Sequence, residues 1–126
     1  IFFAFTINIC VPHNSYKHIN LIQNGGKDMV KHIILWKLKE EAKGENLQKN
    51  VDLLQGKFKA LLGVVDGLIA IEVGINYNGG PADIALYCEF ESREAEVGYQ
   101  SHPDHIAIKA IVKDLVCERN CIDYEI

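Results

Sequence analysis

Apolar side chains, many of them β-branched or aromatic, dominate residues 30–38, which is typical of a β-strand whose side chains alternate between two faces. Polar positions are few, so both faces of this strand are largely apolar. We therefore expect one face to lie under helices and the other to meet a second apolar surface. The first face carries His32, Ile34, Trp36 and Leu38, and the second carries Lys31, Ile33, Leu35 and Lys37.

A helical pattern follows over residues 45–62, where apolar residues recur at spacings of three and four. Gly63 comes directly after this pattern and is a residue type that commonly ends helices. The apolar positions of the predicted helix are Leu47, Val51, Leu54, Phe58 and Leu61.

Shorter elements complete the chain. Strands are predicted over residues 68–73, 83–90 and 119–124. Ser92 suits the cap of a short helix that ends near Tyr99, and Pro103 suits the first position of the next helix. This order predicts the α+β class, a ferredoxin-like βαββαβ protomer with an antiparallel four-stranded sheet and helices on one face.

The other face of that sheet would expose the apolar second face of residues 30–38. Large exposed apolar surfaces mark interaction sites, and symmetric pairs of identical chains are the commonest assemblies. We therefore expect a homodimer through the sheet face.

Composition narrows the class of protein. The 126 residues suit one domain, with 48% hydrophobic and 24% charged residues. A net charge of −4 and scattered basic residues argue against nucleic-acid binding, and no apolar run is long enough for a membrane span. The cysteines match no zinc signature, and we expect buried, reduced thiols in a cytoplasmic protein. They are Cys10, Cys88, Cys117 and Cys121.

Residues 1–28 differ from the rest, and the domain is expected over residues 29–126. The apolar start resembles the core of a signal peptide, but no charged stretch precedes it. Met29 is the only methionine, and the codons of residues 25–28 can form a ribosome-binding sequence. Our hypothesis is that residues 1–28 are a non-domain N-terminal extension from a translated upstream region; a truncated export signal is the alternative.

The segment from Tyr99 to His105 brings two imidazoles and a phenol to a predicted helix start. His105 falls in the first turn, where the helix dipole disfavours the imidazolium. A neutral imidazole near a tyrosine suits general-base catalysis, with Tyr99 orienting the substrate or returning a proton. The structural alternative is that His105 only bonds the backbone. His102 is interpreted as a cap, and a metal site from His102 and His105 lacks an evident third ligand.

Five motifs in order resemble the stress-responsive dimeric α/β-barrel (Dabb) family, over residues 29–126. They are MVKHIILWKLK at 29–39, EVG at 72–74, EFES at 89–92, HPDH at 102–105 and IDYE at 122–125. The resemblance implies a ferredoxin-like protomer whose sheet packs on that of a second copy, forming a dimeric α/β barrel.

The resemblance also implies site residues. In one plant member, olivetolic acid cyclase, a histidine matching His105 and a tyrosine matching Tyr99 transfer protons in an aldol-type condensation. These two residues are therefore the catalytic candidates. A histidine matching His32 lies nearby in that enzyme's pocket, whereas Leu54, Ile108 and Val116 stand where the cyclase has larger rings. The substrate-binding candidates are His32, Trp36, Leu54 and Ile108.

Two functions remain open. The first is cofactor-free acid–base chemistry on a small carbonyl or aromatic metabolite. The sequence has no glycine-rich phosphate loop, nucleophile elbow or metal signature, so neither a cofactor nor a metal is expected. The alternative is a non-catalytic dimeric module that binds a small apolar ligand or supports stress tolerance. Convergence of Tyr99 and His105 on an enclosed pocket would favour the enzyme.

Overall fold

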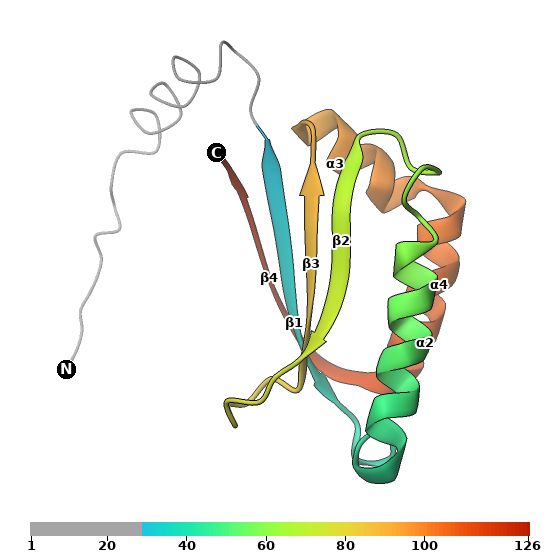
Figure 1. The fold of residues 1–126 in the computed structure, drawn as a ribbon, viewed down its shortest axis with the longest axis vertical. Coiled ribbons are helices and arrows are strands. Elements are labelled where there is room, and N and C mark those ends of the chain that lie inside the picture. Colours follow the sequence, from blue (N-terminus) through green and yellow to red (C-terminus); the bar gives the residue numbers. More distant parts are fainter. Residues whose placement is uncertain (1–28) are drawn as a thin grey trace, which may run out of the picture.

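The computed structural model describes residues 29–126, so the hypotheses about residues 1–28 and Cys10 lie outside the described residues. Figure 1 shows an antiparallel sheet with helices on one of its faces. The predicted order of strands and helices is confirmed. The elements are β1 (Val30–Leu38), two 3-10 turns (Glu40–Ala42 and Gly44–Asn46), α2 (Leu47–Lys59), β2 (Leu68–Ile75), β3 (Ile84–Phe90), α3 (Arg93–Ser101), α4 (Pro103–Leu115) and β4 (Val116–Glu125).

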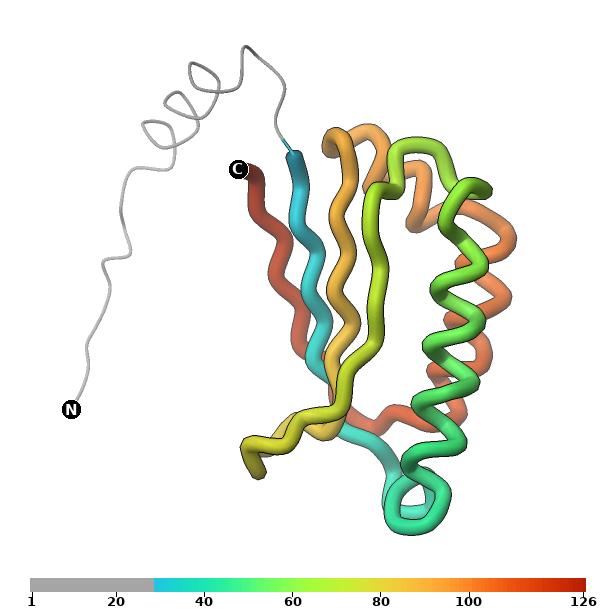
Figure 2. The backbone as a smooth tube through the Cα atoms, viewed as in Figure 1, coloured from blue at the N-terminus to red at the C-terminus, as the bar shows by residue number. Residues whose placement is uncertain are grey.

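The strands lie in the order β2-β3-β1-β4, and every neighbouring pair is antiparallel. Two backbone bonds extend the β1–β4 pairing, from the Met29 N–H to the Ile126 carbonyl (3.3 Å) and from the Ile126 N–H to the Met29 carbonyl (2.9 Å). The start of β1 and the end of β4 therefore lie side by side at one end of the sheet (Figure 2).

The core lies between the sheet and the helices. Every second residue of β1 from Val30 to Leu38 is buried, which confirms the predicted alternation. Opposite this face, α2 buries Val51, Leu54 and Phe58, three of the five apolar positions that its spacing predicts. Leu61 is buried just beyond the end of the helix, and Leu47 is partly buried. The largest fully buried side chains are Tyr99, Phe58, Phe90, Leu38, Leu54, Ile84, Leu86, His32 and Cys88.

Two elements differ most from their predicted bounds. The α-helix predicted over residues 45–62 covers only Leu47–Lys59, because tight turns replace its ends. At its carboxyl end, the Leu61 and Leu62 N–H groups bond carbonyls three residues back, and Gly63 then adopts a φ of 83°. The last strand begins at Val116 rather than at residue 119, because β4 follows α4 directly and pairs with β1 through a register shift at Lys37 and Leu38.

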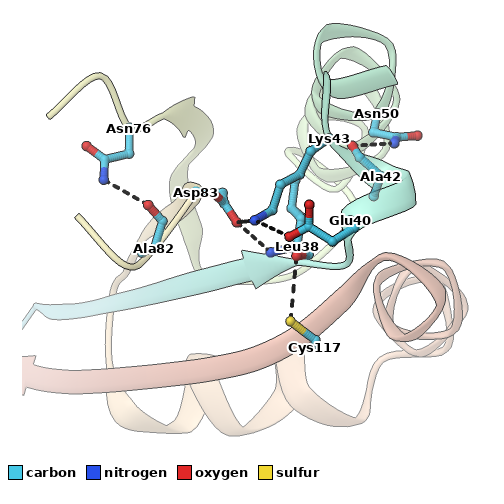
Figure 3. A network of polar contacts seen from close by, with 9 residues as sticks. All are labelled: Leu38, Glu40, Ala42, Lys43, Asn50, Asn76, Ala82, Asp83 and Cys117. Carbon is cyan, nitrogen blue, oxygen red and sulfur yellow. Dashed lines mark hydrogen bonds and ion pairs between the residues drawn. The ribbon is translucent and has the colours of Figure 1, made fainter. Parts of the chain in front are cut away.

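A polar network fixes the end of β1 (Figure 3). The Leu38 N–H donates to the Asp83 carboxylate (2.7 Å), and the Lys43 ammonium lies 3.4 Å from the same oxygen. Lys43 also pairs with Glu40 (3.3 Å), and the Cys117 thiol donates to the Leu38 carbonyl (3.6 Å). The network therefore links the carboxyl end of β1 to the start of β3 and the start of β4.

The second face of the sheet is uncovered by any described residue (Figure 1). Leu35 and Ile122 on this face are 43% and 57% exposed. At the other end of the face, the Lys31 ammonium donates to the Tyr87 hydroxyl (2.8 Å), which donates to Glu89. The expected unpartnered apolar face is thus present, with one polar network inside it.

The thiols described by the structure are free, but only Cys88 is buried as predicted. Cys117 and Cys121 are exposed because β4 is an edge strand beyond the cover of the helices. Within residues 29–126, each helix is too short or too polar to cross a membrane.

Candidate active site

The junction between α3 and α4 positions the candidate catalytic residues. Ser92 caps α3 by accepting a hydrogen bond from the Ala95 N–H (3.1 Å). At the other end His102 has extended backbone, and its Nδ1 accepts from the Asp104 N–H (3.1 Å) at the start of α4. Pro103 is the first residue of α4. The interpretation of His102 as a cap is therefore confirmed.

His105 lies in the first turn of α4 and is only 5% exposed. Its Nδ1–H donates to the Tyr99 carbonyl oxygen (3.0 Å), because a carbonyl oxygen can only accept. This bond places the ring proton on Nδ1 and leaves Nε2 as the basic nitrogen. Burial, with a smaller contribution from the charge of Lys109, lowers the pKa of His105 to about 4. The ring is therefore neutral at pH 7.

Tyr99 is fully buried and stacks on His105, with ring centroids 3.8 Å apart and an interplanar angle of 20°. Its hydroxyl has no hydrogen-bond partner among the described residues. Burial raises the pKa of this hydroxyl, and the neighbouring Cys88 thiol raises it further. Tyr99 does not line the cavity beside His105. The structure thus brings the two residues together through their rings, but only His105 lines the cavity.

A cavity of about 460 Å³ lies between the sheet and α4, a volume typical of small-molecule sites. Its buried wall combines apolar side chains with two imidazoles, and its other residues are partly or fully exposed. The buried lining residues are His32, Ile34, Trp36, Phe58, Leu86 and His105. The partly or fully exposed ones are Gln100, Lys109, Val112, Lys113, Val116 and Arg119.

Trp36 contributes both packing and an unused donor to this wall. Its ring stacks on Phe58, with centroids 6.0 Å apart. It is 3% exposed, and its indole N–H has no acceptor among the described residues. An unpaired buried donor costs roughly 1–3 kcal/mol. The N–H is therefore an unpaired donor that the surrounding protein encloses.

His32 forms a second polar cluster at the cavity wall. It faces Asp123 directly across the β1–β4 pair, and its Nδ1 bonds the Asp123 carboxylate. The Cys121 thiol lies 3.8 Å from the same nitrogen. These three donor atoms lie within 4.8 Å of one another and are of types that Zn²⁺ accepts. The bond between His32 and Asp123 accounts for their proximity without a metal.

The other two candidate binding residues lie elsewhere. Leu54 is fully buried in the core against the sheet and is not part of the cavity wall. Ile108 lines a shallow depression between α2 and α4 instead. Of the substrate-binding candidates, His32 and Trp36 therefore line the cavity, whereas Leu54 and Ile108 do not.

Sequence reasoning missed the basic residues of the cavity. Lys109 and Lys113 stand four residues apart on α4 and thus share one side of the helix. Arg119 reaches the same cavity from β4. The spacing of the two lysines was a usable signal, whereas the position of Arg119 depends on strand pairing over long range.

Comparison with known proteins places this geometry in a family. The model of the stress responsive A/B barrel domain (Dabb) matches residues 30–126. No functionally curated protein matches the chain. A solved dimeric protein of unknown function with a ferredoxin-like fold, from Bacteroides fragilis, is 35% identical with a TM-score of 0.70. The match covers 78% of this chain and 96% of that one.

Two more distant structures share the fold. A Dabb family protein from Mesorhizobium loti is 22% identical with a TM-score of 0.62, over 77% of this chain and 95% of that one. A hydroxynitrile lyase from Passiflora edulis is 14% identical with a TM-score of 0.66, over 79% of this chain and 94% of that one. The family model matches most of the chain, and the sheet, helices and element order agree with it. The chain therefore belongs to the stress-responsive A/B barrel (Dabb) family.

Proposed function

We propose that this protein binds a small carbonyl or aromatic metabolite in the cavity and transfers a proton on it without a cofactor. The observation that carries the proposal is the neutral His105 ring in the cavity wall. The His105 Nδ1–H donates to the Tyr99 carbonyl oxygen (3.0 Å), and this bond leaves Nε2 free to act as a base.

In the proposed step, His105 Nε2 takes a proton from the carbon next to the carbonyl group. The electron pair of that C–H bond moves into the carbonyl and forms an enolate. After a rotation of the Trp36 ring towards the cavity, its N–H, which has no other acceptor among the described residues, would donate to the enolate oxygen. Return of the proton from Nε2 completes an exchange or isomerisation.

Tyr99 supports the base as a positioning residue. Its ring stacks on His105 and its carbonyl accepts the Nδ1–H, so it fixes both the plane and the tautomer of the imidazole. A direct role of the Tyr99 hydroxyl on the substrate stays a prediction, as does the similarity to olivetolic acid cyclase. A hydroxynitrile lyase among the structures of the same fold is consistent with an enzyme on this scaffold.

The test is deuterium exchange of the methyl protons of acetophenone in D₂O, followed by NMR with and without the full chain. Wild type should accelerate exchange, and His105→Asn should lower the rate by about 10²–10⁴-fold. Asparagine can still donate to the Tyr99 carbonyl, so the fold is kept. Trp36→Phe keeps an aromatic ring but removes the N–H, and it should slow exchange more than it weakens binding.

Equal exchange rates for wild type and His105→Asn would refute the base. Binding of the ketone without any exchange would instead support the alternative, a non-catalytic module for a small apolar ligand or for stress tolerance.

The uncovered sheet face supports a homodimer as the working form. Leu35 and Ile122 expose apolar surface there, and solved relatives from Bacteroides fragilis and Thermobifida fusca are described as dimeric. The cavity lies on the opposite face of the sheet, so dimerisation would leave its lining within one protomer. A cytoplasmic location stays a prediction.

A further inference from the structure

Three cations surround the opening of the cavity. Lys109 and Lys113 of α4 and Arg119 of β4 are exposed, and all three line it. None of them forms an ion pair with another described residue. The chain as a whole is acidic, with 17 acidic and 13 basic residues, so this local excess of positive charge runs against the composition.

Two nearby carboxylates bond residues other than the three cations. Asp123 is bonded to His32, and Glu96 accepts a hydrogen bond from the Gln100 amide (2.6 Å). No carboxylate from the described residues lines the cavity itself. The three cations at the rim therefore have no carboxylate partner among the described residues, and they share the cavity with an apolar interior that contains Trp36 and Phe58.

We propose that the ligand of this cavity is an amphiphilic carboxylate, with its anionic group among Lys109, Lys113 and Arg119 and its apolar body against Trp36 and Phe58. This inference rests on the proposed small-molecule site and names its ligand class. The guanidinium of Arg119 suits a planar carboxylate, and the two lysines add charge from the facing helix.

This arrangement also orients the ligand. The rim cations are exposed whereas His105 and Trp36 are 5% and 3% exposed, so the anionic end stays near solvent and the opposite end enters the wall that holds the base. A carboxylate is costly to bury without partners, and the rim lets it keep water while it gains charge complementarity.

Trp36 provides the readout, because it is the only tryptophan of the sequence and lines the cavity. The full chain is titrated with 4-phenylbutanoate and with 4-phenylbutanamide, which have nearly the same shape but differ in charge. Fluorescence of Trp36 should report binding of the carboxylate at least about tenfold tighter than of the amide, and about 0.5 M salt should reduce this preference.

The test variant is Lys109→Gln/Lys113→Gln/Arg119→Gln, which should bind both probes equally. A matched control is Lys49→Gln/Lys57→Gln/Lys59→Gln, since these exposed lysines of α2 remove the same number of charges but do not line the cavity. The control should keep the preference for the carboxylate. Each single rim change should weaken carboxylate binding about two- to fivefold.

The proposal is overturned by equal affinity of the wild type for both probes, by an equal loss in the control variant, or by no binding of either probe. Measuring both proton exchange and carboxylate preference, on wild type and on His105→Asn, tests the proposed function and the ligand class separately. If the wild type prefers the carboxylate but does not accelerate proton exchange on acetophenone, only the proposed catalysis is refuted. If the wild type accelerates proton exchange but binds the carboxylate and the amide equally, only the proposed ligand class is refuted.

Discussion

Acidification should destabilise this fold through His105. The pKa of the buried ring is about 4, against an ordinary value of 6.5 in the unfolded chain. Between these values the unfolded chain binds the proton and the folded one does not, so the free energy of unfolding rises with pH. The contribution of neutral His105 is fully present above about pH 6.5 and is lost as the pH falls towards 4.

The size of this effect follows from the same two values. Their difference corresponds to about 3 kcal/mol of unfolding free energy. The cause is chiefly burial, since the side chain is 5% exposed, with a smaller contribution from the charge of Lys109. This is a large fraction of the stability of an ordinary domain.

The assay is urea unfolding of wild type and His105→Asn at several pH values from about 7 to about 4. The variant keeps a donor towards the Tyr99 carbonyl but cannot titrate, and carboxylates elsewhere contribute equally to both proteins. Wild type should lose about 3 kcal/mol more than the variant across this range. NMR titration of the His105 ring protons gives the pKa directly. Parallel pH profiles, or a ring pKa near 6.5, would refute the account of a buried neutral base.

Three further predictions concern the scaffold. Gly67→Ala places a Cβ 2.4 Å from that of Ala95 at a φ of 81°, whereas a Cβ added at Gly63, with a φ of 83°, meets nothing within 4 Å. Urea unfolding should therefore show Gly67→Ala as more destabilised than Gly63→Ala by roughly 1–3 kcal/mol, and equal losses of stability would contradict the clash. His102→Ala removes the cap of α4 and should cost about 1 kcal/mol in thermal or urea unfolding, whereas His102→Asn should cost less; equal costs would argue against capping. Leu35→Asp should convert the proposed homodimer to monomers with an unchanged circular dichroism spectrum, measured by light scattering, and a persisting dimer would exclude this face.

Local patterns predicted the elements of this fold because each depends on neighbouring residues. The alternation in β1 indicated that His32 and Trp36 face the helices, and both line the cavity. Ser92 and Pro103 marked the starts of α3 and α4 through capping chemistry that acts within one turn.

Long-range pairing was beyond those patterns. His32 and Asp123 are separated by 91 residues and meet only through the register of β1 with β4, which no local spacing encodes. Arg119 reaches the cavity through the same register. For helices, the spacing of apolar residues predicts which side of the helix is buried but not what that side contacts. Sequence reasoning therefore places Leu54 and Ile108 in the binding site, although a small rotation about the helix axis decides whether such a residue faces the core, a cavity or a shallow groove.

The two backbone hydrogen bonds between Met29 and Ile126 hold the first and last residues of the domain side by side. A circular permutant that joins Ile126 to Met29 through a short linker and opens in the exposed turn at Gly79 and Gly80 would therefore keep every strand pairing, as well as the α3–α4 junction. In such a permutant β3, not β1, would leave the ribosome first. The order in which the strands are synthesised would then change while the cavity stays the same. The closeness of Met29 and Ile126 also suits the domain for insertion into a loop of a host protein.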